Sequence, residues 1–276
     1  MKIHRVCWSL FILWLIACDL SAAPTKDFII FDSTLYKNKP DLSEYGIKPI
    51  DLYYQSRFWK KGRSLEKLPS TDQIKKIAGK AMEKNTIAVL DIEHWKLNGS
   101  AQEANESIKK YTTVINQFRN YAPGIKLGYY GLPPIREYYR SLKEENTAAY
   151  KSWQSQNDRL LPLAKSLDIA FPSLYTFKNK PAVWKRYAIA QLKEARRILP
   201  SKPVYAFLWP QFHNSNKQLK NQYIPGDFWK KQLETVRLHA DGVVIWGGWR
   251  NGGPAVWNNQ AEWWTKTLEF ISEHKE

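Results

Sequence analysis

Short apolar runs alternate with longer amphipathic segments along almost the whole chain of 276 residues. The longer segments repeat apolar residues at helical spacing, whereas the short runs have the length and β-branched content of buried strands. Strands of this kind, alternating with helices, are typical of a parallel sheet covered by helices. The strands are predicted at residues 28–31, 49–54, 87–93, 126–131, 168–175, 203–209 and 242–248.

Seven parallel strands with six or seven helices favour a distorted, TIM-like (β/α) barrel of the α/β class over an open doubly wound sheet. No glycine-rich phosphate-binding loop follows the first strand, which argues against a dinucleotide-binding fold. The composition shows no break within residues 27–276. We therefore expect one barrel domain there, and it is long enough to bury a core of its own.

The first residues have the pattern of a targeting segment. A basic start, "MKIHR", precedes the apolar stretch "VCWSLFILWLIA", which is short for a membrane span and typical of a signal peptide at 1–17. The "LIAC" that ends this stretch resembles the lipobox of bacterial lipoproteins, which implies cleavage before Cys18, lipidation of that cysteine and a short tether at 18–26. The alternative is an ordinary signal peptide that is cut later, near "LSAA".

A lipid-anchored protein would lie in the bacterial cell envelope, in the periplasm or at a membrane, rather than being secreted. Inner and outer membrane both stay open. Cys7 and Cys18 are the only two cysteines and both precede residue 27, so the barrel is predicted to have no disulfide and no thiolate ligand. The histidines show no spacing typical of metal ligands, and we expect neither a metal nor a cofactor.

The chain is strongly basic. Without Lys2 and Arg5 of the leader, 40 basic residues remain against 26 acidic residues, a net charge of +14. Such a surplus favours an anionic partner such as a polysaccharide, a nucleic acid or a membrane surface. No nucleic-acid-binding motif is present. We therefore expect an anionic polysaccharide as the partner, no nucleic acid, a membrane contact only through the lipid anchor, and a monomer.

Two carboxylates, Asp91 and Glu93, end the third predicted strand in "AVLDIE". Alternate residues of a strand point to the same face, so the two acids would lie side by side while Ile92 packs on the opposite face. Their repulsion would hold one of them protonated near neutral pH. Because catalytic groups of (β/α) barrels lie at the carboxyl ends of strands, the pair is the candidate catalytic site. Solvated loop residues or a helix cap are the alternative reading.

Four motifs, in order, resemble the hyaluronidase family: "AVLDIEHW", "LGYYGLP", "FPSLYTF" and "GVVIWGGW". The resemblance implies a distorted seven-stranded barrel that cleaves β-linkages next to N-acetylhexosamine with retention, using the acetamido group of the substrate as nucleophile. By this resemblance Glu93 would be the general acid and then the base, and Asp91 would orient the acetamido group. Tyr175 would hydrogen-bond near that group, and Trp246 would form the wall that holds its methyl.

Further aromatic residues follow the predicted strands, where their faces suit stacking on sugar rings. The sequence has 13 Trp and 15 Tyr, and many of them would be ordinary core residues. The additional candidates for substrate binding are Tyr130, Trp95, Trp209, Trp249 and Tyr138.

The chain also departs from the family pattern. Arg136 falls near the place of a family tyrosine, so Tyr138 or Tyr139 would have to stand in for it. Trp209 occupies the place of a family arginine, and the family's disulfides are absent. These departures leave the identity of the polymer open, because the missing arginine could have met a uronic-acid carboxylate.

The predicted function is a retaining, substrate-assisted glycosidase that acts on a β-linked, N-acetylhexosamine-containing polysaccharide of the hyaluronan or chondroitin kind. A chitin- or peptidoglycan-type hexosaminidase is the alternative within the enzyme class, and endo and exo action both stay open. A carbohydrate-binding barrel tethered to the envelope, without catalysis, is the alternative of a different class. The acid pair favours the enzyme, because a binding protein gains little from two costly neighbouring carboxylates.

Overall fold

The computed structural model describes residues 27–250 and 252–274. The predicted signal peptide, the tether and Cys18 lie outside the described residues, so their assignments stay predictions. Within the described ranges, no helix combines the length and the apolar character needed to span a bilayer.

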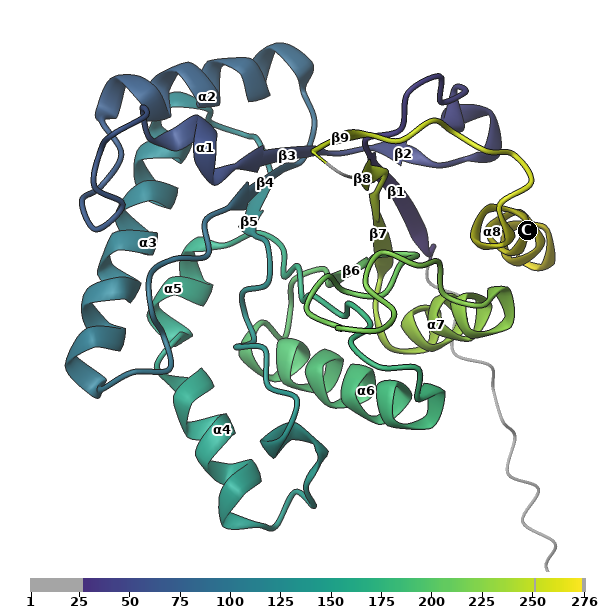
Figure 1. Cartoon of the computed structure of the whole chain (residues 1–276). Helices are drawn as coiled ribbons and strands as arrows, with labels where there is room; N and C mark the ends of the chain where they lie inside the picture. Colours follow the sequence, from purple (N-terminus) through teal and green to yellow (C-terminus); the bar gives the residue numbers. More distant parts are fainter. Residues whose placement is uncertain (1–26, 251, 275–276) are drawn as a thin grey trace, which may run out of the picture.

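Parallel strands form the centre of the molecule (Figure 1). β1 pairs with β7 and with β2, β3 pairs with β4, β4 with β5, and β6 with β7, all of them in parallel. The strands are β1 (Ile29–Thr34), β2 (Lys48–Pro49), β3 (Asp51–Tyr54), β4 (Ala88–Asp91), β5 (Leu127–Tyr129), β6 (Tyr205–Leu208) and β7 (Gly242–Gly247).

Two segments link these strands into a ring. β2 and β3 are one extended stretch interrupted at Ile50, and its first half pairs with β1 while its second half pairs with β4. Between β5 and β6, residues 170–176 pair in parallel with both neighbours through single bridges, among them Tyr130 with Phe171 and Ser173 with Phe207. Pro172 has no N–H to donate, which interrupts regular pairing there. All seven predicted strands therefore take part in a distorted barrel.

Helices cover the outside of the ring (Figure 1). α2 packs on α3, α6 on α7, and α7 on α8. An antiparallel hairpin of β8 (Trp249–Arg250) and β9 (Gly253–Pro254) follows β7. The helices are α1 (Gln55–Phe58), α2 (Thr71–Lys84), α3 (Ala101–Tyr121), α4 (Ala148–Asp158), α5 (Leu161–Ser166), α6 (Pro181–Ile198), α7 (Gly226–His239) and α8 (Glu262–Glu273), with 3-10 turns at Leu42–Tyr45 and Arg140–Leu142.

Most of the strands are buried on both faces, and their side chains alternate between two layers. Odd and even positions of one strand fall into different apolar clusters, one inside the ring and one between ring and helices. Gly128 of β5 faces the crowded interior, where a Cβ atom would lie 2.3 Å from the carbonyl oxygen of Ile169. The inner cluster includes Phe31, Val89, Phe171, Phe207 and Val244, and the outer cluster includes Ile30, Leu90, Leu208, Val243 and Ile245.

Candidate active site

Asp91 and Glu93 continue the inward-facing side of β4. Val89, two residues earlier, lies in the inner cluster, and Asp91 is the last residue of the strand. Ile92 is fully buried in the outer cluster, and the hydroxyl of Tyr111 on α3 donates to its carbonyl oxygen at 3.1 Å. The alternation predicted for "DIE" is therefore confirmed, and both carboxylates face the mouth of the barrel.

A cavity of about 310 Å³ opens at this mouth and is lined by both carboxylates. Four aromatic residues predicted for substrate binding also line it, each at the carboxyl end of a different strand of the ring. These four are Tyr130, Tyr175, Trp209 and Trp246. The fold thus brings together six of the nine residues that the sequence indicated for catalysis and substrate binding.

The aromatic residues of the cavity hold one another in place. The Tyr175 and Trp246 rings are stacked, with centroids 5.8 Å apart and planes at 25°. Trp209 meets Trp246 edge-on at 4.9 Å, and the Nε1–H of Trp246 donates to the hydroxyl of Tyr54 at 2.9 Å. Rings packed at these angles form a rigid apolar wall next to the two carboxylates. Such a wall suits a ligand that presents a small apolar group beside a polar one.

The environment raises the pKa of both carboxyls. Loss of hydration and then repulsion by Glu93 raise the pKa of Asp91 to about 7. Loss of hydration also raises the pKa of Glu93, although its side chain stays accessible to solvent, while the guanidinium of Arg136 lowers it. The sequence predicts that repulsion holds one acid of the pair protonated, and in the structure this repulsion acts mainly on Asp91. The pair can therefore keep one proton near neutral pH.

Five residues of the cavity were not predicted as site residues: Leu52, Tyr54, Arg136, His213 and Asn214. Tyr54 ends the second predicted strand, and this position was a usable signal. Arg136 stood out only as a departure from a motif. Among the described residues, no hydrogen bond or salt bridge engages its guanidinium. The site therefore holds a free positive charge beside Glu93.

A second cavity of about 240 Å³ adjoins the first on the other side of Glu93. The two cavities share Glu93, Tyr130 and Arg136, so the carboxyl of Glu93 stands between two halves of one cleft. Trp95 lines this second half, but it is 3% exposed, and its Nε1–H donates to the carbonyl oxygen of Leu65 at 2.9 Å. Trp95 thus supports the cleft wall more than it offers a stacking face.

Tyr138 and Trp249 line neither half of the cleft, so the structure does not bring them together with the other predicted residues. The Tyr138 hydroxyl donates to the carbonyl oxygen of Tyr175 at 3.1 Å, and its ring stacks on Tyr187 at 4.1 Å. Tyr139 is 67% exposed and also lies outside the cleft. Arg136 lines both halves of the cleft, whereas neither tyrosine does. Trp249 lies on the exposed hairpin strand β8.

One group of possible metal ligands exists in the part of the chain that the structure describes. Glu234, Glu273 and His274 bring ligand atoms within 4.8 Å of one another where α7 meets the end of α8. His274 is bonded to Glu234 at 2.9 Å, and Glu273 pairs with Lys230. These partners use the ligand atoms in ion pairs, and the sequence spacing of the residues did not indicate the group.

The chain was compared with known proteins, and no protein-family model matches it. A salivary hyaluronidase from Lutzomyia longipalpis is 26% identical over 140 residues. The match covers 48% of this chain and 36% of that relative, so the chain spans about a third of the relative's length.

The crystal structure of bee venom hyaluronidase superposes with a TM-score of 0.61 at 16% identity, over 89% of this chain and 96% of that one. The crystal structure of its complex with a hyaluronic acid tetramer superposes with a TM-score of 0.62 at 14% identity, over 89% of this chain and 95% of that one. Sequence and fold point to the same group of proteins. The chain forms a barrel whose fold is similar to that of bee venom hyaluronidase, and about half of its sequence is similar to a salivary hyaluronidase.

Proposed function

We propose that the protein is a glycoside hydrolase that cleaves a β-linked, N-acetylhexosamine-containing polysaccharide with retention of configuration. The observation that carries the proposal is the pair Asp91 and Glu93 at the mouth of a cavity walled by Tyr175 and Trp246. The pair supplies an acid and a negative charge side by side, and the wall suits the methyl of an acetamido group.

In the first step the acetamido oxygen of the substrate attacks the anomeric carbon while Glu93 gives its proton to the leaving glycosidic oxygen. The bond from carbon to the leaving sugar breaks, and an oxazoline-like ring forms. Asp91 accepts a hydrogen bond from the acetamido N–H and stabilises the positive charge on that ring. In the second step Glu93 takes a proton from water, which opens the ring at the same carbon and restores its configuration.

The shared proton of the pair suits this sequence of steps. With its pKa near 7, Asp91 competes with Glu93 for one proton when the site is empty. An acetamido N–H that donates to Asp91 stabilises its carboxylate form, which leaves the proton on Glu93. Substrate binding would therefore keep Glu93 protonated, so that it can donate its proton to the leaving glycosidic oxygen.

An anionic polymer such as hyaluronan or chondroitin is the proposed substrate class. Arg136 lies beside Glu93 between the two halves of the cleft, and Lys96 lines the second half. Both cations could meet a uronic-acid carboxylate, and the net charge of the chain would draw such a polymer to the cleft. The similar proteins are described as a salivary hyaluronidase and a hyaluronidase in complex with a hyaluronic acid tetramer.

The decisive experiment measures new reducing ends on hyaluronan, chondroitin, chitin oligomers and peptidoglycan with the wild-type protein and Glu93→Gln. We expect cleavage of a uronic-acid polymer, with first products of retained configuration by NMR. Glu93→Gln should lower turnover by ~10²–10⁴-fold with affinity largely kept, since general acid–base catalysis is typically worth that factor.

Other outcomes decide between the alternatives. Turnover of Glu93→Gln within twofold of wild type would remove this residue from the mechanism. Cleavage of chitin oligomers or peptidoglycan alone would support the uncharged-substrate alternative. Binding of one polymer with cleavage of none would support a carbohydrate-binding barrel.

We also propose that the protein is anchored to the cell envelope through Cys18, because "LIAC" ends an apolar stretch of signal-peptide length. Mass spectrometry of the mature N-terminus tests this proposal. An acylated Cys18 is expected, and an unmodified terminus near Ala22 to Pro24 would contradict it.

A further inference from the structure

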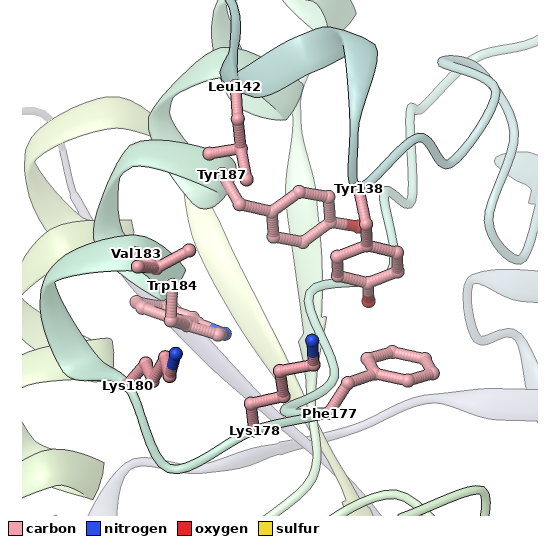
Figure 2. Close-up of a pocket in the computed structure, with 8 residues that line it drawn as sticks. All are labelled: Tyr138, Leu142, Phe177, Lys178, Lys180, Val183, Trp184 and Tyr187. Atoms are coloured by element: carbon pink, nitrogen blue, oxygen red, sulfur yellow. The ribbon is translucent and has the colours of Figure 1, made fainter.

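A separate cavity of about 300 Å³ lies beside the N-terminal end of α6 (Figure 2). We call it the α6 pocket. None of the residues that line it lines either half of the cleft. Its walls carry the rings of Tyr138, Phe177, Trp184 and Tyr187, and Lys178 extends toward the rings of Tyr138 and Tyr187.

The polar atoms of these rings already have partners in the barrel wall. The Nε1–H of Trp184 donates to the carbonyl oxygen of Leu174 at 2.8 Å. The hydroxyl of Tyr187 donates to the backbone carbonyl oxygen of Ser173 at 3.0 Å. Tyr138 likewise donates to a backbone carbonyl. The rings therefore present mainly their apolar faces to the α6 pocket.

Unlike the polar atoms of the rings, the positively charged groups of the α6 pocket have no partner among the described residues. Lys178 and Lys180 both line it and are exposed. In the described ranges of the chain, neither ammonium group takes part in a salt bridge or a side-chain hydrogen bond. The α6 pocket thus combines aromatic faces with two free cations, which suits a ligand that has an apolar face and a carboxylate.

A thin aromatic partition separates the α6 pocket from the cleft. Phe177 of the pocket stacks on His213 with centroids 4.3 Å apart and planes at 25°, and His213 lines the first half of the cleft. Tyr138 bonds to the backbone of Tyr175, which also lines the cleft. A polymer that leaves the cleft over His213 would therefore reach the α6 pocket next.

We propose that the α6 pocket is an accessory binding site for a uronic-acid residue of the polysaccharide, beyond the sugars held in the cleft. The C–H face of the pyranose would lie against the aromatic walls, and its carboxylate would pair with Lys178 and Lys180. The inference rests on the proposed function for the choice of polymer, and on continuity with the cleft and charge complementarity for the site.

The test is calorimetric titration of the non-hydrolysing Glu93→Gln protein with a length series of hyaluronan oligosaccharides and their carboxyl-reduced counterparts. Adding Lys178→Gln and Lys180→Gln should weaken binding of the long oligosaccharides by about three- to tenfold. The shortest oligosaccharides that bind should be unaffected, and carboxyl reduction of the ligand should remove the difference. Lys76→Gln with Lys80→Gln, two exposed cations of α2, is the control with the same loss of charge.

An equal loss of affinity in the control variant, or no loss of affinity at any oligosaccharide length, would overturn the assignment of the α6 pocket as a uronic-acid site. A wild-type protein that binds no uronic-acid oligosaccharide would overturn it as well. Hydrolysis by the wild-type protein would still leave the proposed function standing in the first two cases. Conversely, a length-dependent loss of affinity in a protein that cleaves no polymer would support the accessory binding site and contradict the proposed hydrolase activity.

Discussion

At the residue scale, two carboxylates on one short strand end have different electrostatic surroundings. Asp91 ends β4 in the barrel mouth, where burial and its neighbour raise its pKa to about 7. Glu93 is accessible to solvent and faces Arg136, which works against the rise in its own pKa. The two acids of one three-residue motif therefore differ in the charges that act on them.

We expect Asp91→Asn to stabilise the protein above neutral pH. Since the folded-state pKa of Asp91 is raised to about 7, the folded protein holds this proton more tightly than the unfolded chain. The stability linked to that proton is complete below pH ~4 and is lost as the pH rises through about 7. The free energy of unfolding of Asp91→Asn should exceed that of wild type by about 1–3 kcal/mol at pH 8, with little difference at pH 4.

Denaturant unfolding across that pH range measures the effect. Asp72→Asn, an exposed position at the start of α2, serves as the control and should show no such gain. A wild-type protein at least as stable as Asp91→Asn at pH 8 would rule out an elevated pKa at this site.

We expect Arg136→Met to move the alkaline limb of the pH profile of kcat/KM to higher pH. Arg136 lowers the pKa of Glu93, so its removal lets that pKa rise. The acid must be protonated to act, and activity is therefore lost at a higher pH. Arg63→Met, at an exposed loop position outside the cleft, is the matched control. An unchanged or lowered limb in Arg136→Met would contradict the coupling between Arg136 and Glu93.

At the element scale, α3, the helix that follows Asp91 and Glu93 in the chain, begins with a capping box. The side chain of Ser100 accepts from the backbone N–H of Glu103 at 3.2 Å, and Glu103 accepts from the N–H of Ser100 at 2.9 Å. This capping box fixes the first turn of α3, and α3 in turn carries Tyr111, which bonds to the backbone of Ile92. The helix thus supports the strand end from outside the ring.

Ser100→Ala should lower the free energy of unfolding by about 1 kcal/mol, because it removes the acceptor of the cap. Turnover at 25 °C should stay close to wild type, since α3 remains folded. Thermal and denaturant unfolding measure the loss, with Ser155→Ala at an exposed position inside α4 as the control. Equal stability of the two variants would show that the cap contributes nothing.

At the scale of the whole molecule, the net positive charge of the chain and the cations of its cavities favour the same anionic ligand. The full chain carries a formal net charge of +16, and the cleft holds Arg136 while the α6 pocket holds two free lysines. Long-range attraction raises the association rate of an anionic polymer, whereas contacts inside the cleft decide turnover. The two contributions respond differently to salt.

The kcat/KM value for hyaluronan should therefore fall steeply as sodium chloride rises from low to physiological concentration, because exposed charges are screened beyond about 8–10 Å at 0.1–0.15 M. The kcat value at saturating polymer should change little. Initial rates over a salt series measure both. A flat kcat/KM for the polymer that is cleaved would argue for a neutral substrate held by aromatic contacts.

Local patterns in the sequence were enough to predict the framework. Strand and helix periods are set over a few residues, so the apolar runs indicated the seven strands, and the two-residue period placed Asp91 and Glu93 on one face with Ile92 on the other. The same patterns placed Tyr130, Tyr175, Trp209 and Trp246 at the ends of predicted strands. Parallel strands in a barrel end at the same side, and in the structure these four residues line one cavity.

Only the tertiary structure decided what depends on contacts between distant segments. Trp246 bonds to Tyr54, 192 residues away, and no local pattern encodes that pair. The path of the loop after β5 put Arg136 into the cleft and turned Tyr138 into the α6 pocket. Burial raises the pKa of both acids, and Arg136 opposes the rise in the pKa of Glu93. Loop paths and burial arise from packing of the whole chain, so a sequence read a few residues at a time cannot supply them.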